Sequence, residues 1–155
     1  MSMSLVLQRY LRDHNIAYEM LPHRPTRSSL NSASAAHVPG SKLAKPVILE
    51  DDQGYVMVVI PATEHLKIGR LNQTLQRNMG LATESELRGL FSDCETGAIP
   101  PLGQAYQMET VVDDSLLQCN DIYFEAGDHT DLIHIKGSSF RQLMQGNRHA
   151  ALCVH

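Results

Sequence analysis

The chain has 155 residues, of which 43% are hydrophobic and 19% are charged, as is usual for a globular domain of this size. The net charge of −4 excludes a protein that coats nucleic acid broadly, because such proteins need many cations, and leaves room for a small contact with one end of an RNA. The sequence has no CxxC pair, no signal-peptide pattern and no apolar run long enough to cross a membrane. We therefore expect one cytoplasmic domain over residues 1–155, with its core at about 5–145 and with neither DNA nor a membrane as a partner.

Apolar periodicity and turn residues in the first half of the chain predict helices and a β-hairpin. The segment Asp51-Asp52-Gln53-Gly54 should join two strands as a tight turn, because its glycine can take a positive φ. In chain order, we expect a helix over residues 4–14, a strand over 16–21, a loop over 23–29, a helix over 33–38, and strands over 43–49 and 55–60.

The second half of the chain mixes short strands with helices. Thr83-Glu84-Ser85-Glu86 matches the S/T-x-x-E capping box and should begin a helix that continues to about Phe91. The other expected elements are a helix over 66–77, a Gly/Pro loop over 97–103, strands over 110–112, 121–124 and 132–135, and a helix over 138–145. The tail over 147–155 shows no pattern. These elements predict an α+β domain with a mixed, curled and barrel-like β-sheet flanked by helices.

Lys45 lies inside an apolar, strand-like run from Leu43 to Leu49. In a strand it would share a face with these two leucines and Val47, where an ammonium is disfavoured unless it reaches water, a carbonyl or an anion. Pro46 cannot donate a ladder hydrogen bond, so this part of the strand should lie at a sheet edge or a bulge. Two interpretations stay open: a lysine whose stem packs while its head reaches solvent, and a cation that serves a pocket.

The segment Gly97-Ala98-Ile99-Pro100-Pro101-Leu102-Gly103 forms a stiff loop. Its two prolines fix φ and have no N–H, so nearby carbonyls can lack backbone donors and accept from an ammonium or hydroxyl of a ligand. The alternative is a rigid connection between a helix and a strand. Elsewhere the sequence has no metal-ligand grouping among its eight histidines, no GxSxG elbow and no phosphate-binding glycine motif, so it predicts neither a metal nor a cofactor.

These segments occur in an order that resembles the YbaK/EbsC family, whose domain is also the editing insertion of bacterial prolyl-tRNA synthetases. The resemblance runs from about residue 5 to 144. The matching segments are His23, the run Lys45-Pro46-Val47-Ile48-Leu49, Val58-Val59-Ile60-Pro61, the loop from Gly97 to Gly103 with its GxxxP pattern, Val112-Asp113 with Ser115-Leu116, and Ile122-Tyr123-Phe124-Glu125-Ala126-Gly127.

The resemblance implies a freestanding, metal-independent enzyme that hydrolyses the ester between a wrong amino acid and its tRNA, in trans. It implies that Lys45 is the essential lysine, near the phosphate or ester of the tRNA 3′ terminus, and that the terminal ribose hydroxyl assists in place of a side-chain base. The implied substrate-binding residues are His23, Gly97, Ala98, Ile99, Pro100, Pro101, Gly103, Glu125 and Gly127. The cationic residues expected at the tRNA acceptor end are Arg24, Arg27 and Lys42, with Lys67 and Arg70 as further candidates and a solvated surface as the alternative for each.

Glu125 departs from the family pattern, because relatives often carry Ser or His at this position, which helps to choose the amino acid. A carboxylate there could bind the α-ammonium or a hydroxylated side chain, or could face solvent. Alanine, serine, threonine and cysteine all stay open as the amino acid. Two further functions also stay open. One is a non-catalytic module that binds aminoacyl-tRNA or a synthetase partner, which the acidic charge favours; the other is a hydrolase of small aminoacyl esters or amides.

Overall fold

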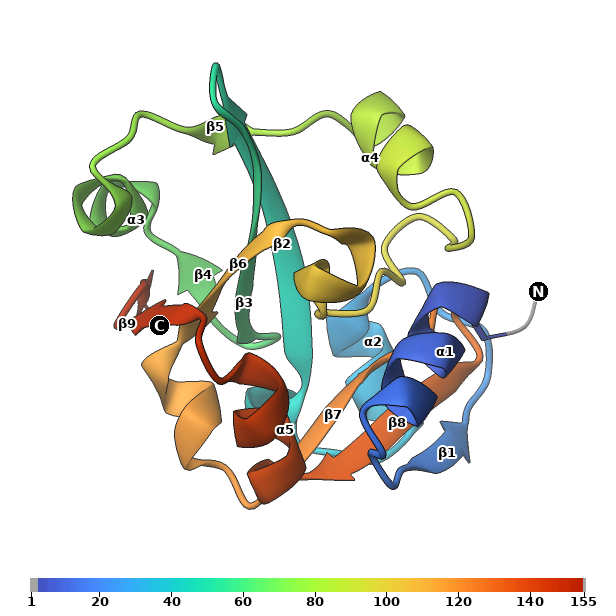
Figure 1. The fold of residues 1–155 in the computed structure, drawn as a ribbon. Helices are drawn as coiled ribbons and strands as arrows, with labels where there is room; N and C mark the ends of the chain where they lie inside the picture. Colours follow the sequence, from blue (N-terminus) through green and yellow to red (C-terminus); the bar gives the residue numbers. More distant parts are fainter. Residues whose placement is uncertain (1–2, 155) are drawn as a thin grey trace.

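The computed structural model describes residues 3–154 and has an α+β architecture (Figure 1). No helix among these residues is both long and apolar enough to span a membrane. The α-helices are α1 (Leu5–Asp13), α2 (Ser29–Ala35), α3 (Ile68–Leu75), α4 (Glu84–Leu90) and α5 (Gly137–Met144), and the 3-10 helices are η1 (Gly40–Lys42), η2 (Gly103–Tyr106) and η3 (Asp114–Gln118).

The central sheet is mixed, as predicted, and has the strand order β5-β2-β3-β6-β9. β2 and β3 form the predicted hairpin with Asp51 opposite Gly54, while β6 runs parallel to β3 and β9 runs parallel to β6. The Arg77 guanidinium donates to both carboxylate oxygens of Asp51 and so ties the hairpin turn to the segment after α3. The strands are β2 (Ala44–Asp51), β3 (Gly54–Pro61), β5 (Gly80–Leu81), β6 (Glu109–Asp113) and β9 (Arg148–Ala150).

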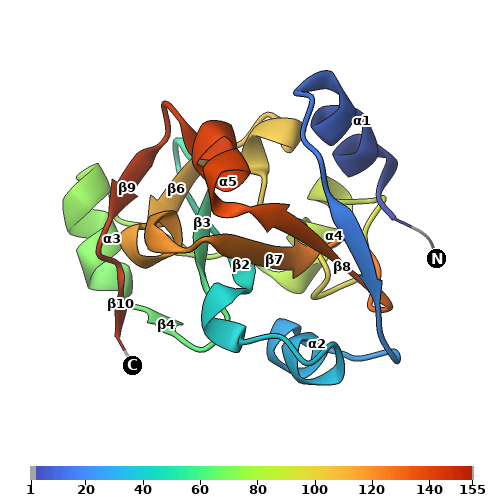
Figure 2. The same cartoon turned by 90° about the horizontal axis from the view of Figure 1, so that it is seen from below.

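A second sheet contains β1 (Glu19–Pro22), β8 (Asp131–Lys136) and β7 (Asp121–Glu125), in that order and all antiparallel. Figure 2 shows these strands side by side, with α5 on one side of them and α2 on the other. Within residues 3–154 the sheets do not close into the barrel-like arrangement that we predicted. Among the described residues, the isolated β-bridge between the two sheets joins Leu43, just before β2, to Tyr123 of β7 in parallel, so the strands curl without closing.

The core fills both faces of the central sheet, which explains the continuous apolar run of β3. Met57 and Val59 face the main core, where they pack with strands β7 and β8, helix α5 and the buried face of α1. Val58 and Ile60 face a second cluster, which the leucines of α3 cover. A strand that is buried on both faces reads as an unbroken hydrophobic segment and not as an alternating one. The hairpin that carries Lys45 is therefore held rigidly.

Some predicted boundaries shift for local reasons. α2 begins at Ser29 and not at residue 33, because the Ser28 side chain accepts a hydrogen bond from the Asn31 N–H and caps the helix. The predicted capping box at α4 is confirmed, with the Thr83 and Glu86 side chains each bonded to the other's backbone. The tail, which showed no pattern, adds β9 to the central sheet and pairs β10 (Cys153–Val154) with β4 (His65–Leu66).

Candidate active site

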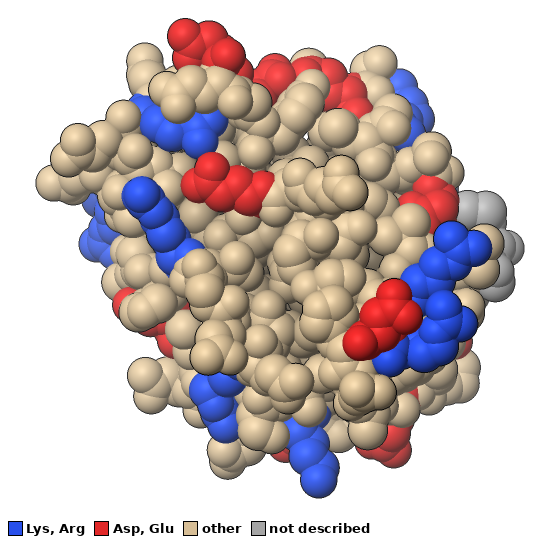
Figure 3. All heavy atoms as spheres, in the orientation of Figure 1, with Lys and Arg blue, Asp and Glu red and all other residues tan. Residues whose placement is uncertain are grey.

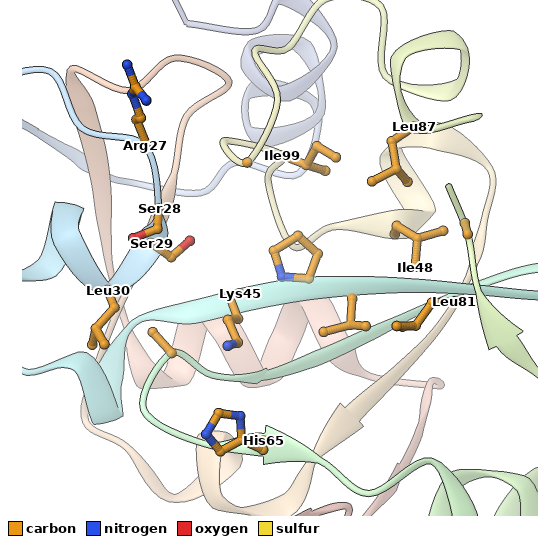
Figure 4. A pocket seen from close by; sticks show the side chains of 15 residues that line it. Arg27, Ser28, Ser29, Leu30, Lys45, Ile48, His65, Leu81, Leu87 and Ile99 are labelled. Carbon is orange, nitrogen blue, oxygen red and sulfur yellow. The ribbon is translucent and has the colours of Figure 1, made fainter. Parts of the chain in front are cut away.

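A pocket of about 480 Å³ opens beside strand β2 (Figure 4). Its walls come from the start of α2 and the two residues before it, from the first half of β2, from short strands β4 and β5, from α4, and from the Gly/Pro loop. Segments that are far apart in the sequence therefore meet here. Lys45 of β2 and Gly97 of the Gly/Pro loop, which were singled out separately from the sequence, line the same cavity.

The pocket lies where β2 has a free edge. β5 pairs with β2 only at Leu49 and Glu50, so the preceding residues have a partner strand on one side only. The Ile48 carbonyl accepts from the Ala82 N–H at 3.0 Å and points to this edge, and backbone direction alternates along a strand, so the backbone of Pro46 points to the same edge. This confirms the edge position that the missing N–H of Pro46 predicted. The proline leaves the pairing of β2 with β3 intact.

Lys45 is half-buried and belongs to the pocket wall. Its ammonium forms no hydrogen bond or ion pair with any residue in 3–154, so its charge is not neutralised by a protein partner there. A half-buried ammonium without a fixed partner favours a negative ligand or a developing negative charge in the cavity. The structure thus places Lys45 where a bound anion or ester can reach it.

The Gly/Pro loop forms the opposite wall through Gly97 and Ile99. Gly97 has a φ of +83°, which is unfavourable for residues with a side chain. A methyl group added there would lie 3.1 Å from the Arg27 carbonyl oxygen and 3.3 Å from Cε1 of His129. Glycine is therefore required both for the backbone conformation and for the close packing of this wall.

The loop is fixed by a network of hydrogen bonds to the turn between β7 and β8. The Gly127 N–H donates to the Ala98 carbonyl at 2.9 Å, and the Glu95 N–H donates to the Gly127 carbonyl at 2.8 Å. The His129 ring contacts the Thr96 carbonyl through Nε2 at 2.5 Å, and its backbone N–H donates to the Glu95 carboxylate at 3.0 Å. These bonds hold the wall in place without any contribution from a ligand.

The family model for the aminoacyl-tRNA editing domain matches residues 23–143. The chain belongs to the aminoacyl-tRNA editing domain family. This agrees with the resemblance to YbaK/EbsC seen in the sequence. Among curated proteins, none matches the chain.

Solved structures share the fold of this editing domain. Hypothetical protein APE2540 has a TM-score of 0.84 and 22% identity, with 96% of this chain and 99% of that chain covered. A proposed trans-editing enzyme for prolyl tRNA synthetase has a TM-score of 0.80 and 20% identity, with 99% and 100% covered. A proposed signal transduction protein from Marinobacter aquaeolei VT8 has a TM-score of 0.79 and 20% identity, with 99% of this chain but only 31% of that chain covered.

Four of the residues predicted from the sequence line the pocket of the editing domain: Lys45, Arg27, Gly97 and Ile99. The others lie outside its lining, although several support it. Within the loop, Ala98 is buried, and the buried Gly103 begins η2 with its Cβ position filled by the Thr110 hydroxyl. The remaining predicted residues outside the lining are His23, Arg24, Lys42, Pro100, Pro101, Glu125 and Gly127. Their contact with a substrate stays a prediction.

Glu125 does not face solvent, which was one of the open interpretations, because its side chain is completely buried. Among residues 3–154 neither carboxylate oxygen has a hydrogen-bond partner, and the neighbouring Ser32 hydroxyl is paired with Thr26 at 2.5 Å. Burial raises the pKa of the Glu125 carboxyl to about 8; the nearby Ser32 hydroxyl opposes this shift, and the negative charges of Asp128 and Glu95 add to it. The carboxyl is therefore mostly protonated at neutral pH, so it serves as a neutral polar group beneath α2.

Sequence reasoning missed several pocket residues. His65 stood isolated in the sequence and reaches the pocket because the turn after β3 places the start of β4 in the pocket lining. Leu30 and Leu81 line the pocket although they are 52% and 61% exposed, so they form an apolar rim. An exposed leucine carries no signal by itself, since many leucines on protein surfaces have no ligand. These residues become visible only when the tertiary structure brings them together.

Lys and Arg side chains do not form a continuous basic surface on the face shown in Figure 3, where they alternate with Asp and Glu. A broad grip on the tRNA body through this face is therefore not expected. The positive charges that do line the pocket are Lys45 and Arg27.

Replacing Gly97 with alanine should impair the pocket more than the fold. The positive φ and the contact with the Arg27 carbonyl should lower the free energy of unfolding by about 1–2 kcal/mol and displace the wall. We expect deacylation to fall at least about tenfold, measured as kcat/KM with the protein fully folded. Gly89→Ala is the matched control, because among residues 3–154 no atom outside its chain neighbours and the adjacent helix backbone lies within 4 Å of its added methyl group. Equal activity of the two variants would contradict a role for the Gly97 backbone.

Proposed function

We propose that this editing domain is a freestanding deacylase that hydrolyses the ester of a mischarged aminoacyl-tRNA in trans. The main support for the proposal is that Lys45 and the wall containing Gly97 line the same pocket. Membership of the editing domain family supports a deacylase role. Because one protein of the same fold is a proposed trans-editing enzyme for prolyl tRNA synthetase, a tRNA for proline carrying a wrong amino acid is the first candidate substrate.

The pocket suits an aminoacyl ester attached to the terminal nucleotide. Its volume of about 480 Å³ is within the range of small-molecule sites and exceeds what a small amino acid alone requires. The end formed by Ile48, Leu81 and Leu87 is apolar, whereas Lys45 supplies positive charge between that end and the side at Leu30 (Figure 4). The ammonium would stabilise either the terminal phosphate or the oxygen that becomes negative when water attacks the ester. Catalysis would then rest mainly on positioning and electrostatics.

The amino acid is a small one in this proposal: alanine, serine, threonine or cysteine. A pocket of fixed size rejects larger side chains but separates isosteric ones poorly, because one methyl or hydroxyl group changes binding only modestly. We therefore expect release of more than one of these amino acids, with rates that differ by about one or two orders of magnitude.

The decisive experiment measures release of amino acid from tRNAs charged with Ala, Ser, Thr, Cys and Pro by the wild-type protein. Loss of one or two of the small amino acids, with correctly charged Pro-tRNA left intact, would support the proposal. Absence of release from every member of the panel would overturn it.

Arg27 is the cation in the pocket wall best placed to contact the tRNA backbone, since it lines the pocket and is exposed. We predict that Arg27→Ala raises KM for charged tRNA about three- to tenfold with little change in kcat. The slope of log KM against log salt concentration should decrease by about one, as expected for the loss of one phosphate contact. Measurements at several salt concentrations test this, with Arg12→Ala on the exposed face of α1 as the control. An unchanged salt slope would remove Arg27 from the tRNA contact, and Arg24 and Lys42 would be the next to test.

A second candidate function is a non-catalytic module that binds aminoacyl-tRNA or a synthetase. The net charge of −4 and the alternating charges on the face shown in Figure 3 favour a protein partner over a direct grip on the tRNA body. Tight binding of charged tRNA, or co-purification with a synthetase, without any turnover would favour this function over the deacylase.

A further inference from the structure

One end of the pocket is apolar and open to solvent (Figure 4). It is lined by Ile48 of β2, Leu81 of β5 and Leu87 of α4, and we call these three side chains the apolar end. Leu81 is 61% exposed, whereas the other two are more buried. Covering such a leucine with an apolar surface stabilises a complex in proportion to the area that is removed from water. The apolar end therefore favours a ligand group with an apolar face.

Backbone hydrogen bonds and core packing hold the apolar end in place. Leu81 pairs with Leu49 of β2, and the Ala82 N–H donates to the Ile48 carbonyl at 3.0 Å. The capping box fixes the first turn of α4, and Leu87 packs against the main core. A ligand at this end therefore meets a surface that is already formed, so little binding free energy is lost in ordering it.

Polar lining residues lie on the other side of Lys45. In Figure 4 Arg27 and Ser29 lie away from the apolar end, with Lys45 between. The ammonium and carbonyl groups of an amino acid need polar partners, which that side of the pocket supplies. The methyl or hydroxymethyl group of a small amino acid would leave most of the apolar end uncovered. A different part of the substrate is therefore required to cover it.

We propose that the apolar end binds the adenine of the terminal nucleotide of charged tRNA, and that Leu81 thereby positions the ester. The proposal rests on the proposed deacylase function. A tRNA ends in adenosine whatever its amino acid, so a site that contacts the face of the base, without reading its edges, serves every such substrate. The base is uncharged, which matches an end formed by three aliphatic side chains.

Strand β2 connects the apolar end to Lys45. Along this strand Pro46 lies between Lys45 and Ile48, at the free edge where, among the described residues, no strand pairs with it on the pocket side. Its carbonyl can accept a hydrogen bond from a ribose hydroxyl there. Binding free energy from a base that takes no part in bond cleavage then holds the ester beside the Lys45 ammonium.

Titration with adenosine, followed by NMR chemical shifts, tests the site without any turnover. We expect Leu81→Ala to raise the Kd for adenosine about three- to tenfold, because apolar contact area is lost. Leu81→Met retains most of that area and should bind within about twofold of the wild type. Leu5→Ala is the matched control, because Leu5 on α1 is also 61% exposed and lies outside the pocket lining. Its Kd should equal that of the wild type.

A second measurement compares two esters of the small amino acid that the wild type releases fastest: its charged tRNA and its ethyl ester, which has no nucleoside. Leu81→Ala should raise KM for the charged tRNA about three- to tenfold and leave kcat/KM for the ethyl ester within about twofold of the wild type. An equal loss with both esters, or a changed preference among amino acids, would place the amino acid at this end and overturn the proposal.

The adenosine titration separates failure of this site from failure of the deacylase function. A wild-type protein that releases amino acid but binds no adenosine, or a Leu81→Ala variant that binds adenosine as the wild type does, would overturn the adenine site and leave the deacylase standing. Absence of release by the wild type would overturn the deacylase function, whereas adenosine binding that depends on Leu81 would still support the site.

Discussion

Lys45→Ala should reduce kcat for deacylation at least about 100-fold while the protein stays folded. The ammonium lines the pocket and has no protein partner within residues 3–154, so its removal takes away charge stabilisation without leaving a buried carboxylate unpaired. Loss of one preorganised charge or donor at a developing oxyanion typically costs about 10²- to 10³-fold in rate. Single-turnover release from charged tRNA measures the chemical step directly.

The control for Lys45→Ala is Lys136→Ala, an exposed lysine at the end of β8 and outside the pocket lining. Lys45→Arg separates charge from shape, because the larger planar guanidinium keeps the charge but places it differently. We expect Lys45→Arg to retain binding of charged tRNA and to lose most of the rate. An equal fall in the deacylation rate of the Lys45 and Lys136 variants would show that the rate depends on the net charge of the protein and not on the ammonium in the pocket.

Glu125→Gln should remove a large pH dependence of stability. Burial raises the pKa of Glu125 from 4.5 to about 8 in the folded protein, so between these values the unfolded chain loses a proton that the folded protein retains. Stability therefore falls as the pH rises through this window, by up to about 5 kcal/mol for a shift of this size. Glutamine cannot ionise, so this decline should disappear in the variant.

Denaturant unfolding at several pH values between 5 and 8 tests the Glu125 prediction. The free energy of unfolding of Glu125→Gln relative to the wild type should increase by several kcal/mol across that range. Glu84→Gln, at an exposed position in the first turn of α4, should show no comparable trend. Parallel curves for Glu125→Gln and the wild type would mean that the buried carboxyl has found a partner when ionised.

Local signals in the sequence predicted the parts of the fold that depend on local chemistry. The capping box at Thr83 and the turn ending at Gly54 satisfy backbone groups within a few residues, so their positions follow from sequence spacing. The edge position of Pro46 followed equally directly, because the missing N–H excludes an interior ladder position. Each of these features is determined by the chemistry of one short segment.

Long-range features could not be predicted in the same way. β9 and β10 exist only because the tail pairs with β6 and β4, and nothing in the tail itself specifies those partners. The open sheet, predicted as barrel-like, depends on how far β7 approaches β2, and this is set by packing across the core. Strand partners that are distant in sequence are chosen by the whole structure and not by local preference.

The same distinction between local and long-range features applies to the residues of the candidate site. Lys45 and Gly97 stood out because a lysine in an apolar strand and a Gly/Pro loop are unusual in sequence, and both line the pocket. The contribution of His65 depends on the turn after β3, and the burial of Glu125 depends on α2 packing over β7, so neither was visible in the chain itself. Unusual residues can be found from sequence, but the neighbours that give them a function require the fold.

The free edge of β2 has a consequence for aggregation. An exposed sheet edge offers unpaired backbone groups to the strands of other molecules, and this is a common route to association of misfolded or crowded chains. Here Pro46 presents no N–H at that edge, and the adjacent Lys45 carries a charge that resists burial between paired strands. Pro46 and Lys45 therefore leave this edge accessible to a small ligand and also hinder its pairing with another β-strand. Changes that make this edge more apolar and restore its N–H should promote self-association even where they improve local packing.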